Sequence, residues 1–518
     1  MTSRKKLPIG IQTFAKIREE GCYYVDKTPQ ILRLIEDGSH YFLSRPRRFG
    51  KSLLLDTIAE LFEGRRALFT GLHAEPRWDW SRTFPVIRIS FSDGVLHSQA
   101  ALQQRIRLLL ADNYERLGLE QPQGQDLPGL FAKLLQLACA RGGQRVVVLV
   151  DEYDKPILDN ITEPEVARQM RDGLRDLYSV LKGQDAYIKF ALLTGVSKFS
   201  KVSLFSGLNN LRDITVSADY SAICGYTDED VDQVFAPELP GLDRDEIRRW
   251  YNGYNWTGTS VYNPFDLLLL FQEREFRPYW FETGTPTFLV DLLMQRDTFT
   301  PELGQWVTMD SLLSTFDVDE ISSEALLFQS GYLTIGSQFK MGARTEYTLK
   351  YPNQEVEASL NGALLQALTA RSTETARQSG RLYRLLQAND FAGLRALFTA
   401  FFASIPNDWY RSNRIANYEG YYASVFYSHF AALGLDIRLE DVTNKGRIDM
   451  AVLFNGQVYL FEFKVVEDMP QGKALQQIRD RGYAEKYRAR GETIHLVGVE
   501  FSREQRSVVG FEVETLLS

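Results

Sequence analysis

Apolar runs alternate with amphipathic stretches through the first 220 residues of the chain. The runs have the length of β-strands, and the segments between them repeat apolar positions with the period of a helix. The run RVVVLV has no polar alternation, which is typical of a strand buried on both faces of a parallel sheet. Strands that alternate with helices predict such a sheet with helices on both faces. The predicted strands are 40–43, 85–91, 146–151, 186–195 and 213–217, and the predicted helices are 31–35, 51–63, 98–117, 127–140 and 166–182.

The stretch FLSRPRRFGKSLLLD, residues 42–56, predicts a phosphate-binding loop. A strand ends in a basic turn, and a Lys-Ser pair then begins an amphipathic helix. N–H groups and the helix dipole at a helix N-terminus attract anions, so Lys51 would reach the β- and γ-phosphates of a nucleotide and Ser52 would hold Mg²⁺. Arg45 stands where the usual motif has its first Gly, and a capped surface helix would also explain GKS taken alone.

The stretch RVVVLVDEYDKP supplies the carboxylates that a nucleotide triphosphatase needs. Asp151 and Glu152 follow the buried strand at its carboxyl end, where parallel sheets bind ligands. Asp151 would support Mg²⁺ through its water shell, and Glu152 would polarise the attacking water. Thr194 ends the next strand, where it would sense the γ-phosphate or simply cap the strand. Tyr24 and its polar neighbours would lie over a nucleotide base or form a polar lead-in to the first strand.

The middle of the chain is predicted to be mostly helical. Residues 223–400 contain helical and aromatic stretches that suit a lid and connector, and the polar segment 372–380 is expected to mark a boundary. The predicted domains are therefore 1–222, 223–400 and 401–518. Five aromatic residues of the middle are interpreted as core rather than base-stacking residues: Tyr251, Tyr254, Trp256, Trp280 and Phe281.

The stretch GRIDMAVLFNGQVYLFEFKVV, residues 446–466, predicts a β-hairpin with Asn-Gly at its turn. In the register of a two-residue turn, Asp449 lies opposite Glu462, and Lys464 shares their face. Two facing carboxylates repel each other unless a cation lies between them, and Mg²⁺ prefers such oxygen ligands. Lys464 would then orient water or stabilise charge on a phosphorane. A solvated face with Glu–Lys pairs is the alternative, although Asp is unfavourable in mid-strand.

Two helices predicted on either side of the hairpin carry further candidates. The upstream helix offers Glu419 as another metal ligand or orienting group, and the two strands predicted after the hairpin, TIHLVGVEF and VVGFEVE, would complete a mixed sheet. The downstream helix has one polar face suited to a phosphodiester backbone, although a charged face is more often merely solvated. That face is predicted to carry Lys473, Gln477, Arg481 and Arg488.

Composition and charge limit the functional classes. The 518 residues carry a formal net charge of −8, so any contact with nucleic acid must come from local basic patches. Three widely spaced cysteines suggest a reducing compartment rather than a disulfide framework or a zinc site. The sequence shows neither a signal peptide nor an apolar run of the ~18 residues that a membrane span needs. We therefore expect a cytoplasmic protein that does not bind a membrane.

The chain resembles a bacterial and archaeal family in which an AAA-ATPase-like domain precedes a PD-(D/E)xK nuclease domain. The resemblance covers most of the chain and is carried by LPIGIQTF, YYVDKT, FLSRPRRFGKS, VVVLVDEYDKP, LLTGVSKFSKVSLFSGLNNL, WYNGY, VYNPF, FETGTPTFL, YEGYYASVF, GRIDM, FEFK and ALQQI. It implies a P-loop fold, a helical middle and a restriction-endonuclease-like α/β fold. In this family the loop reads PRRFGKS, so Arg45 is a family trait.

The resemblance also implies two functional sites. The nuclease pattern of Asp, Glu-x-Lys and a helical Gln is matched by Asp449, Glu462, Lys464 and Gln477, with Glu419 on the preceding helix as a further ligand. The ATP site would use Arg45, Pro46, Arg47, Arg48, Phe49, Gly50, Lys51, Ser52 and Thr194, with Glu152 as the catalytic residue and Mg²⁺ held by Ser52 and Asp151. Mg²⁺ is the expected metal at both sites, and Mn²⁺ is an alternative at the nuclease site.

Two functions of different classes follow. The first is an ATP-gated, metal-dependent nuclease that acts on DNA in preference to RNA, in defence or mobile-element biology. The second is a nucleotide-dependent switch that does not cleave and whose C-terminal domain only grips nucleic acid or a partner. The intact pair of Asp449 and Glu462 favours the first, because binding alone does not need two facing carboxylates. A homo-oligomer is compatible with either.

Overall fold

The computed structural model describes residues 4–198, 210–282, 289–290, 292–293, 300–313, 322–369, 372–404, 419–443 and 446–517. The chain divides into two compact units. The first comprises Met1–Trp280 and Gln305–Asn353, and the second comprises Phe281–Gly304 and Gln354–Ser518. Residues 223–400, expected to form a separate middle region, are thus shared between the two units.

A five-stranded parallel sheet forms the centre of the first unit. Its strand order is β2-β3-β4-β1-β5, and its pairs are parallel. The expected parallel sheet is confirmed, with β4 between β1 and β3. The last predicted strand, 213–217, is wrong in extent, because the chain turns after Asp213, whose carboxylate accepts the Thr215 N–H. The strands are β1 His40–Ser44, β2 Val86–Ser90, β3 Val146–Asp151, β4 Ile188–Gly195 and β5 Arg212–Asp213.

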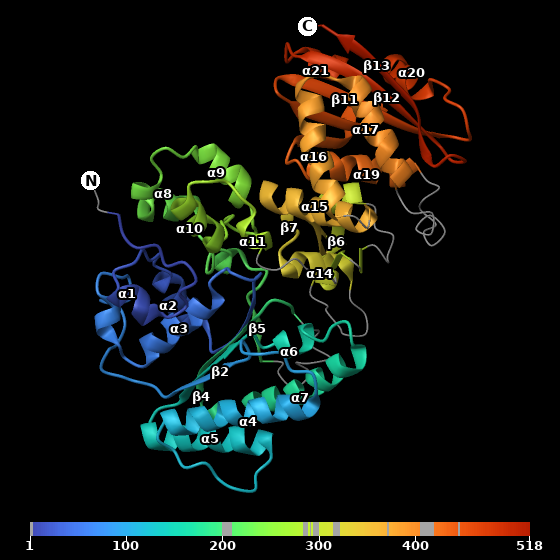
Figure 1. The fold of residues 1–518 in the computed structure, drawn as a ribbon. Helices are drawn as coiled ribbons and strands as arrows, with labels where there is room; N and C mark the ends of the chain where they lie inside the picture. The colour runs from blue at the N-terminus through green and yellow to red at the C-terminus, as the bar shows by residue number, and fades with distance from the viewer. Residues whose placement is uncertain are drawn as a thin grey trace. The chain divides into compact units, whose positions relative to one another are not determined.

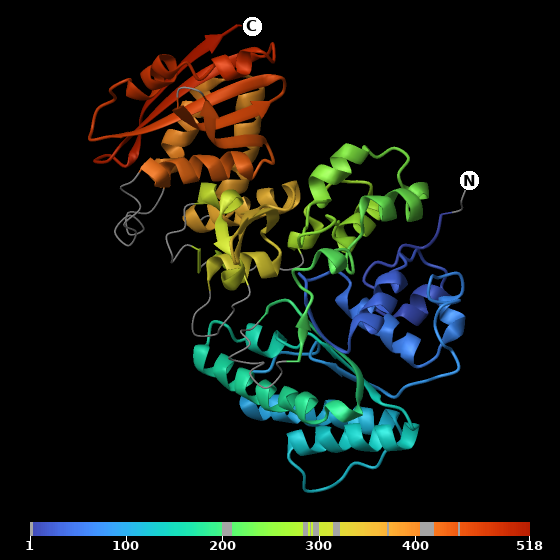
Figure 2. The same ribbon diagram turned by 180° about the vertical axis from the view of Figure 1, so that it is seen from behind.

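Helices cover both faces of this sheet, as Figures 1 and 2 show. On one side lie α1 Phe14–Glu19, α2 Thr28–Asp37 and α3 Lys51–Phe62, and on the other lie α4 Gln99–Arg116, α5 Leu127–Gly142 and α7 Pro164–Gly183, while the short α6 Lys155–Leu158 follows β3. Every residue of β1 and β3 is buried, as the unalternating apolar runs predict. Helix α1 was not predicted from the sequence.

The rest of the first unit is largely helical but includes a small sheet that the sequence analysis missed. Tyr251, Tyr254, Trp256 and Trp280 are buried, which confirms their interpretation as core residues, whereas Phe281 is only half-buried. The helices are α8 Asp228–Val234, α9 Arg244–Tyr251, α10 Pro264–Glu273, α13 Asp310–Leu313 and α14 Ser323–Ser330, and the division after Trp280 falls within α11 Tyr279–Glu282. The antiparallel sheet has the order β6-β8-β7 with β6 Val307–Met309, β7 Thr334–Met341 and β8 Arg344–Lys350.

The second unit is built on a five-stranded mixed sheet of order β13-β12-β11-β10-β9. Strands β11 and β12 are parallel and the other neighbours are antiparallel, which confirms the predicted mixed sheet. One face packs against α17 and α19, and α20 covers the other. The elements are α15 Gln354–Thr369, α16 Ser372–Gln387, α17 Phe391–Ser404, α19 Glu419–Ala431, β9 Asp436–Thr443, β10 Gly446–Phe454, β11 Gln457–Val466, α20 Lys473–Arg481, α21 Glu485–Arg488, β12 Thr493–Ser502 and β13 Ser507–Leu516.

The boundary expected at 372–380 is wrong. This segment forms the first half of α16, whose later residues Leu382 and Leu386 are fully buried in the core of the second unit. Polar composition alone suggested a linker, but tertiary packing at the end of the helix holds the whole segment in one element.

The predicted hairpin is confirmed. Phe454 pairs with Gln457 and Met450 with Phe461, and both turn residues, Asn455 and Gly456, have positive φ. Positive φ at both positions is the conformation that a two-residue turn with right-handed strand twist requires.

Within the described residues, no helix combines the length and apolarity needed to cross a membrane.

Gly498 on β12 sets how closely α20 approaches the sheet. A Cβ atom there would lie 2.3 Å from the Leu475 amide nitrogen and 2.8 Å from its Cα, both of them helix backbone atoms. Since backbone cannot yield as a side chain can, only glycine allows this approach.

We expect Gly498→Ala to lower the free energy of unfolding by about 2 kcal/mol, because the new methyl group overpacks the helix–sheet interface. Urea unfolding of the full chain measures the effect. Gly362→Ala, on α15, is the matched control, since its new methyl group would meet the Ala432 Cβ at an ordinary contact distance of 3.9 Å and alanine favours helix. Equal stability of the two variants would contradict the close approach at Gly498.

Candidate nucleotide and metal sites

The loop between β1 and α3 has the conformation of an anion-binding turn. Gly50 takes φ 88° immediately before α3, in the left-handed region that glycine adopts without steric cost. Arg48 also has a positive φ, of 71°. The first N–H groups of a helix have no partner within it and carry the positive end of its dipole. The loop therefore presents the N-terminus of a 12-residue helix at the carboxyl end of β1.

Lys51 lies inside this loop. Its side chain is buried, and Nζ donates to the carbonyl oxygens of Arg45 at 2.9 Å and Pro46 at 3.0 Å. Burial lowers the pKa of the Lys51 ammonium group, while Asp151 acts in the opposite direction. A cation held this way has exchangeable partners, since phosphate oxygens can replace the two carbonyls.

The Asp151 carboxylate joins three elements. Ser52 Oγ on α3 donates to Oδ2 at 2.6 Å, and Thr194 Oγ1 on β4 donates to Oδ1 at 2.8 Å. The structure thus brings together three residues that the sequence analysis assigned to one site. A hydroxyl beside a carboxylate is an oxygen ligand set of the kind that Mg²⁺ prefers, so these residues fit the metal.

Glu152 follows with a strained backbone. Its φ is 51°, uncommon for a residue with a side chain, and its N–H donates to Asp151 Oδ1 at 3.1 Å. Burial, and next the Asp151 charge, raise the pKa of the Glu152 carboxyl. A carboxylate made more basic in this way is better suited to accept a proton from water.

Asp154 is a residue that the sequence analysis missed. It is almost fully buried and accepts hydrogen bonds from the Val196 N–H, the Ser197 N–H at 2.6 Å and the Ser197 hydroxyl at 2.5 Å. Asp154 therefore ties the end of β3 to the chain leaving β4. The signal was present in the sequence as a third acidic residue in DEYD.

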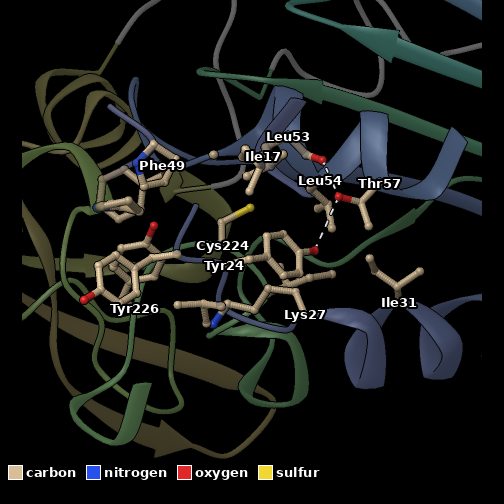
Figure 3. A pocket seen from close by; sticks show the side chains of 17 residues that line it. Ile17, Tyr24, Lys27, Ile31, Phe49, Leu53, Leu54, Thr57, Cys224 and Tyr226 are labelled. Carbon is tan, nitrogen blue, oxygen red and sulfur yellow. Dashed lines mark hydrogen bonds between the residues drawn. The ribbon is translucent and has the colours of Figure 1, made fainter. Parts of the chain in front are cut away.

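A cavity opens beside the loop, as Figure 3 shows, and its space including the part open to solvent is about 530 Å³. It is mainly apolar, and the Tyr24 hydroxyl lies 3.5 Å from Thr57 Oγ1 at its wall. Asp26 does not line it and instead binds the Thr28 and His73 N–H groups, so for Asp26 the polar lead-in is the better interpretation. Lining residues from the N-terminal segment, the loop, α3 and the chain before α8 include Tyr24, Lys27, Phe49, Gly50, Thr57, Cys224 and Tyr226.

In the second unit, Glu462 is fully buried on β11. Gln477 Nε2 on α20 donates to its Oε1, and Lys464 Nζ lies 3.4 Å from the same oxygen. Oε2 has no hydrogen-bond partner within the described part of the chain. An orphaned buried carboxylate oxygen fits a site for a cation.

Asp449 interrupts the strand pairing beside Glu462. The backbone register continued by one residue from Met450–Phe461 sets Asp449 opposite Glu462, and Asp449 Oδ2 accepts the Phe463 N–H at 2.8 Å. Burial, and next the Asp449 charge, raise the pKa of Glu462 to about 8. Without a bound cation, Glu462 therefore keeps its proton to a higher pH than an exposed glutamate does.

Three further expectations for this site have mixed outcomes. The Glu419 side chain lies outside the described residues, and among those described no group of three or more His, Cys, Asp or Glu is placed to hold a metal. Lys473, Gln477 and Arg481 follow helical spacing on α20. Arg488 does not share their face, because α20 ends at Gly482, with φ 57°, and Arg488 belongs to α21.

Glu500 on β12 is another residue that the sequence analysis missed. Its buried carboxylate accepts the N–H groups of residues 471–474, including Lys473 at 2.6 Å. An anion at a helix N-terminus satisfies the unpaired N–H groups and the dipole. Glu500 and the close approach at Gly498 together fix α20, and hence Gln477, over Glu462.

Comparisons with known proteins match both parts of the chain. A family model for a predicted AAA-ATPase matches residues 8–205, and a model of the PD-(D/E)XK nuclease superfamily matches residues 417–511. A protein of Azotobacter chroococcum mcd 1, described as an uncharacterized protein in the vnfD 5′ region, is 69% identical over 515 residues, 99% of this chain and 100% of that protein.

A solved structure, the Aeropyrum pernix Orc1 protein in complex with DNA, aligns with 67% of this chain and 95% of its own at 12% identity and a TM-score of 0.28. No conclusion follows from so low a score. The two family matches do contain the two sites, Lys51 to Thr194 in the first and Asp449 to Gln477 in the second.

The raised pKa of Glu462 predicts a pH-dependent stability. The folded protein holds a proton up to about pH 8, whereas an unfolded Glu releases it near pH 4.3. This carboxyl's contribution to stability is therefore complete below the unfolded pKa and is lost as pH rises through the folded pKa. Relative to Glu462→Gln, which stays neutral, we expect wild type to lose on the order of 1 kcal/mol per pH unit across this range.

Thermal unfolding of both proteins from pH 5 to pH 9 without divalent cations measures this difference. Adding Mg²⁺ should reduce it above neutral pH, since a metal competes with the proton. Glu467→Gln, a surface substitution in the same unit, is the control. Wild-type and Glu462→Gln curves that run parallel would rule out the buried proton.

Proposed function

Because the chain belongs to the family of predicted AAA-ATPases that carry a C-terminal domain of the PD-(D/E)XK nuclease superfamily, we propose that it binds and hydrolyses ATP and cleaves DNA with a divalent metal. The observation that supports this most is the grouping of distant residues. Ser52, Asp151 and Thr194 come together in one unit, and Asp449, Glu462, Lys464 and Gln477 come together in the other.

At the ATP site, each residue has a role consistent with its position. Lys51 exchanges its two carbonyl partners for β- and γ-phosphate oxygens. Ser52 and Asp151 would hold Mg²⁺, which neutralises phosphate charge when bound. Glu152 accepts the proton of the attacking water, and Thr194 binds near the γ-phosphate.

The cavity beside the loop supports the same proposal. It lies next to Gly50 at the start of α3 and is lined by the aromatic rings of Tyr24, Phe49 and Tyr226. A flat, mostly apolar purine fits such a lining. We therefore assign the base of ATP to this cavity.

At the nuclease site, Asp449 and Glu462 would hold Mg²⁺ or Mn²⁺, which polarises a phosphodiester and acidifies a bound water. Glu462 must first lose its proton, so cation binding strengthens as pH rises. Lys464 stabilises charge on the phosphorane, and Gln477 holds the Glu462 carboxylate in place. The exposed Lys473 and Arg481 on α20 contact the DNA backbone.

We expect Lys51→Ala to abolish ATP binding, since the loop loses its buried cation. Glu152→Gln should keep binding but lower turnover by about 10²-fold or more, because phosphate and metal contacts survive while the proton acceptor is lost. Calorimetric ATP binding and phosphate release measure the two effects. An unchanged rate of ATP hydrolysis in Glu152→Gln would contradict the assignment of Glu152 as the proton acceptor.

We expect Glu462→Gln to remove cleavage and leave ATP hydrolysis intact, since the nuclease residues lie in a separate unit with their own ligands. The assay incubates purified full-length protein with single-stranded DNA, duplex DNA and RNA, with and without Mg²⁺. Asp449→Asn should behave like Glu462→Gln, and the surface variant Glu467→Gln should behave like wild type.

The same assay across ATP concentrations tests gating. A cleavage rate that rises with ATP in wild type but not in Lys51→Ala supports control of the nuclease by nucleotide. A rate that ignores both indicates an ungated nuclease. No cleavage of any substrate in the presence of bound metal would favour the switch that only grips nucleic acid.

A further inference from the structure

Arg45, at the position where the phosphate-binding motif usually has glycine, makes contacts that a glycine could not. Its side chain is fully buried. Nη1 donates to the carbonyl oxygens of Ser44 at 2.8 Å and Thr215 at 2.9 Å, and Nη2 donates to that of Tyr220 at 3.0 Å. The guanidinium carbon also lies 3.9 Å from the centre of the Trp256 ring. The Arg45 side chain thus joins the loop to the chain after β5.

The Arg45 backbone faces the other way, into the loop. Its N–H donates to the Gly195 carbonyl at 3.1 Å, at the end of β4. Its own carbonyl oxygen accepts from Lys51 Nζ at 2.9 Å. A single residue therefore connects the end of the sheet, the buried lysine and the Trp256 ring. Because its side chain and its backbone are engaged in these contacts, Arg45 does not itself bind phosphate.

The rest of the loop packs on the same aromatic region. The Trp280 indole N–H donates to the Arg47 carbonyl at 3.1 Å, and the Phe49 ring meets the Tyr254 ring edge-on with centroids 4.7 Å apart. Phe49 also meets Trp256 edge-on at 5.6 Å. All of these residues lie within the first unit, so its aromatic core is the support on which the loop is shaped.

Burying a guanidinium costs free energy unless partners offset it, and arginine finds partners through a rigid planar fork that lysine lacks. Within the described residues, Nε of Arg45 has no hydrogen-bond partner, so the carbonyls bound by Nη1 and Nη2 and the Trp256 ring supply this compensation. Removing the side chain would leave the carbonyls of Thr215 and Tyr220 without these donors and a space against Trp256. The backbone of the loop would then lose the restraint that fixes the Arg45 carbonyl relative to Lys51.

Resting on the ATP site proposed above, we propose that Arg45 is a positioning residue for phosphate binding, braced by Trp256. Its guanidinium holds the loop backbone in the shape that presents Lys51 and the N-terminus of α3 to the phosphates. Restoring the usual glycine at position 45 should therefore weaken nucleotide binding, and the loss should grow with the number of phosphates.

The test compares ATP, ADP and AMP binding by calorimetry in full-length wild type, Arg45→Gly and Arg45→Lys. We expect Arg45→Gly to lose at least tenfold in ATP affinity, less for ADP and least for AMP, which engages the base cavity with little help from the loop. Arg45→Lys should recover only part of the loss. Trp256→Leu removes the ring face but leaves Arg45, so it should lose less affinity, again most for ATP and least for AMP. If Arg45→Gly does not fold, the result for Trp256→Leu tests the inference.

Arg107→Gln is the matched control, since it removes an exposed guanidinium from α4, which among the described residues makes no contact with Arg45 or its partners. An equal loss for all three nucleotides would indicate general destabilisation and overturn the inference, as would unchanged ATP affinity in both Arg45→Gly and Trp256→Leu. If wild type binds no nucleotide, the proposed ATPase function fails, and the inference that rests on it fails as well. Strong wild-type binding with unaffected variants defeats the inference alone.

Discussion

A charged side chain withdrawn from water must find partners or give up its charge, and this constraint shapes both units of the protein. Arg45 satisfies it with backbone carbonyls and a ring, and Lys51 with two carbonyls of its own loop. Asp154 satisfies it with N–H and hydroxyl donors. Glu462 differs from these three, because one of its oxygens has no partner within the described residues, and burial and the Asp449 charge raise its pKa. The buried charges therefore separate into those that hold the scaffold and one whose state a cation can change.

The two sites are consequently prepared in different ways. In the proposed ATP site, the Ser52 and Thr194 hydroxyls are already hydrogen-bonded to the Asp151 carboxylate. The proposed nuclease site is held in place by α20, whose position depends on Glu500 and on the absence of a side chain at Gly498. Within the described residues, each set of side chains lies in a single unit. Coupling between them would require an element with two arrangements that both ligands bias.

Features governed by local rules were predictable from the sequence. The Asn455-Gly456 turn fixed the hairpin register, and the apolar run before Asp151 identified a buried parallel strand. Features governed by tertiary contacts were not. The end of α20 at Gly482 separated Arg488 from a face that periodicity alone had assigned to it, and the polar start of α16 resembled a linker because the residues that anchor the helix come later in it.

The same distinction between local rules and tertiary contacts applies to the residues of the candidate sites. Residue types and spacing predicted which side chains come together, as for Ser52, Asp151 and Thr194. They could not predict direction, and the motif position of Arg45 suggested a nucleotide contact although its side chain points into the protein. Nor could they reveal Glu500, whose role depends on a helix that begins almost thirty residues before it.

The aromatic support of the phosphate-binding loop has an optical consequence. Trp256 lies against the guanidinium of Arg45, and the indole N–H of Trp280 is bound to the Arg47 carbonyl. Indole emission responds to nearby charge and to the hydrogen bond at its nitrogen, so both rings stand where a change in loop shape alters their surroundings. The chain thus carries intrinsic fluorophores beside the loop, and changes in the conformation of the loop can be followed in real time without an attached label.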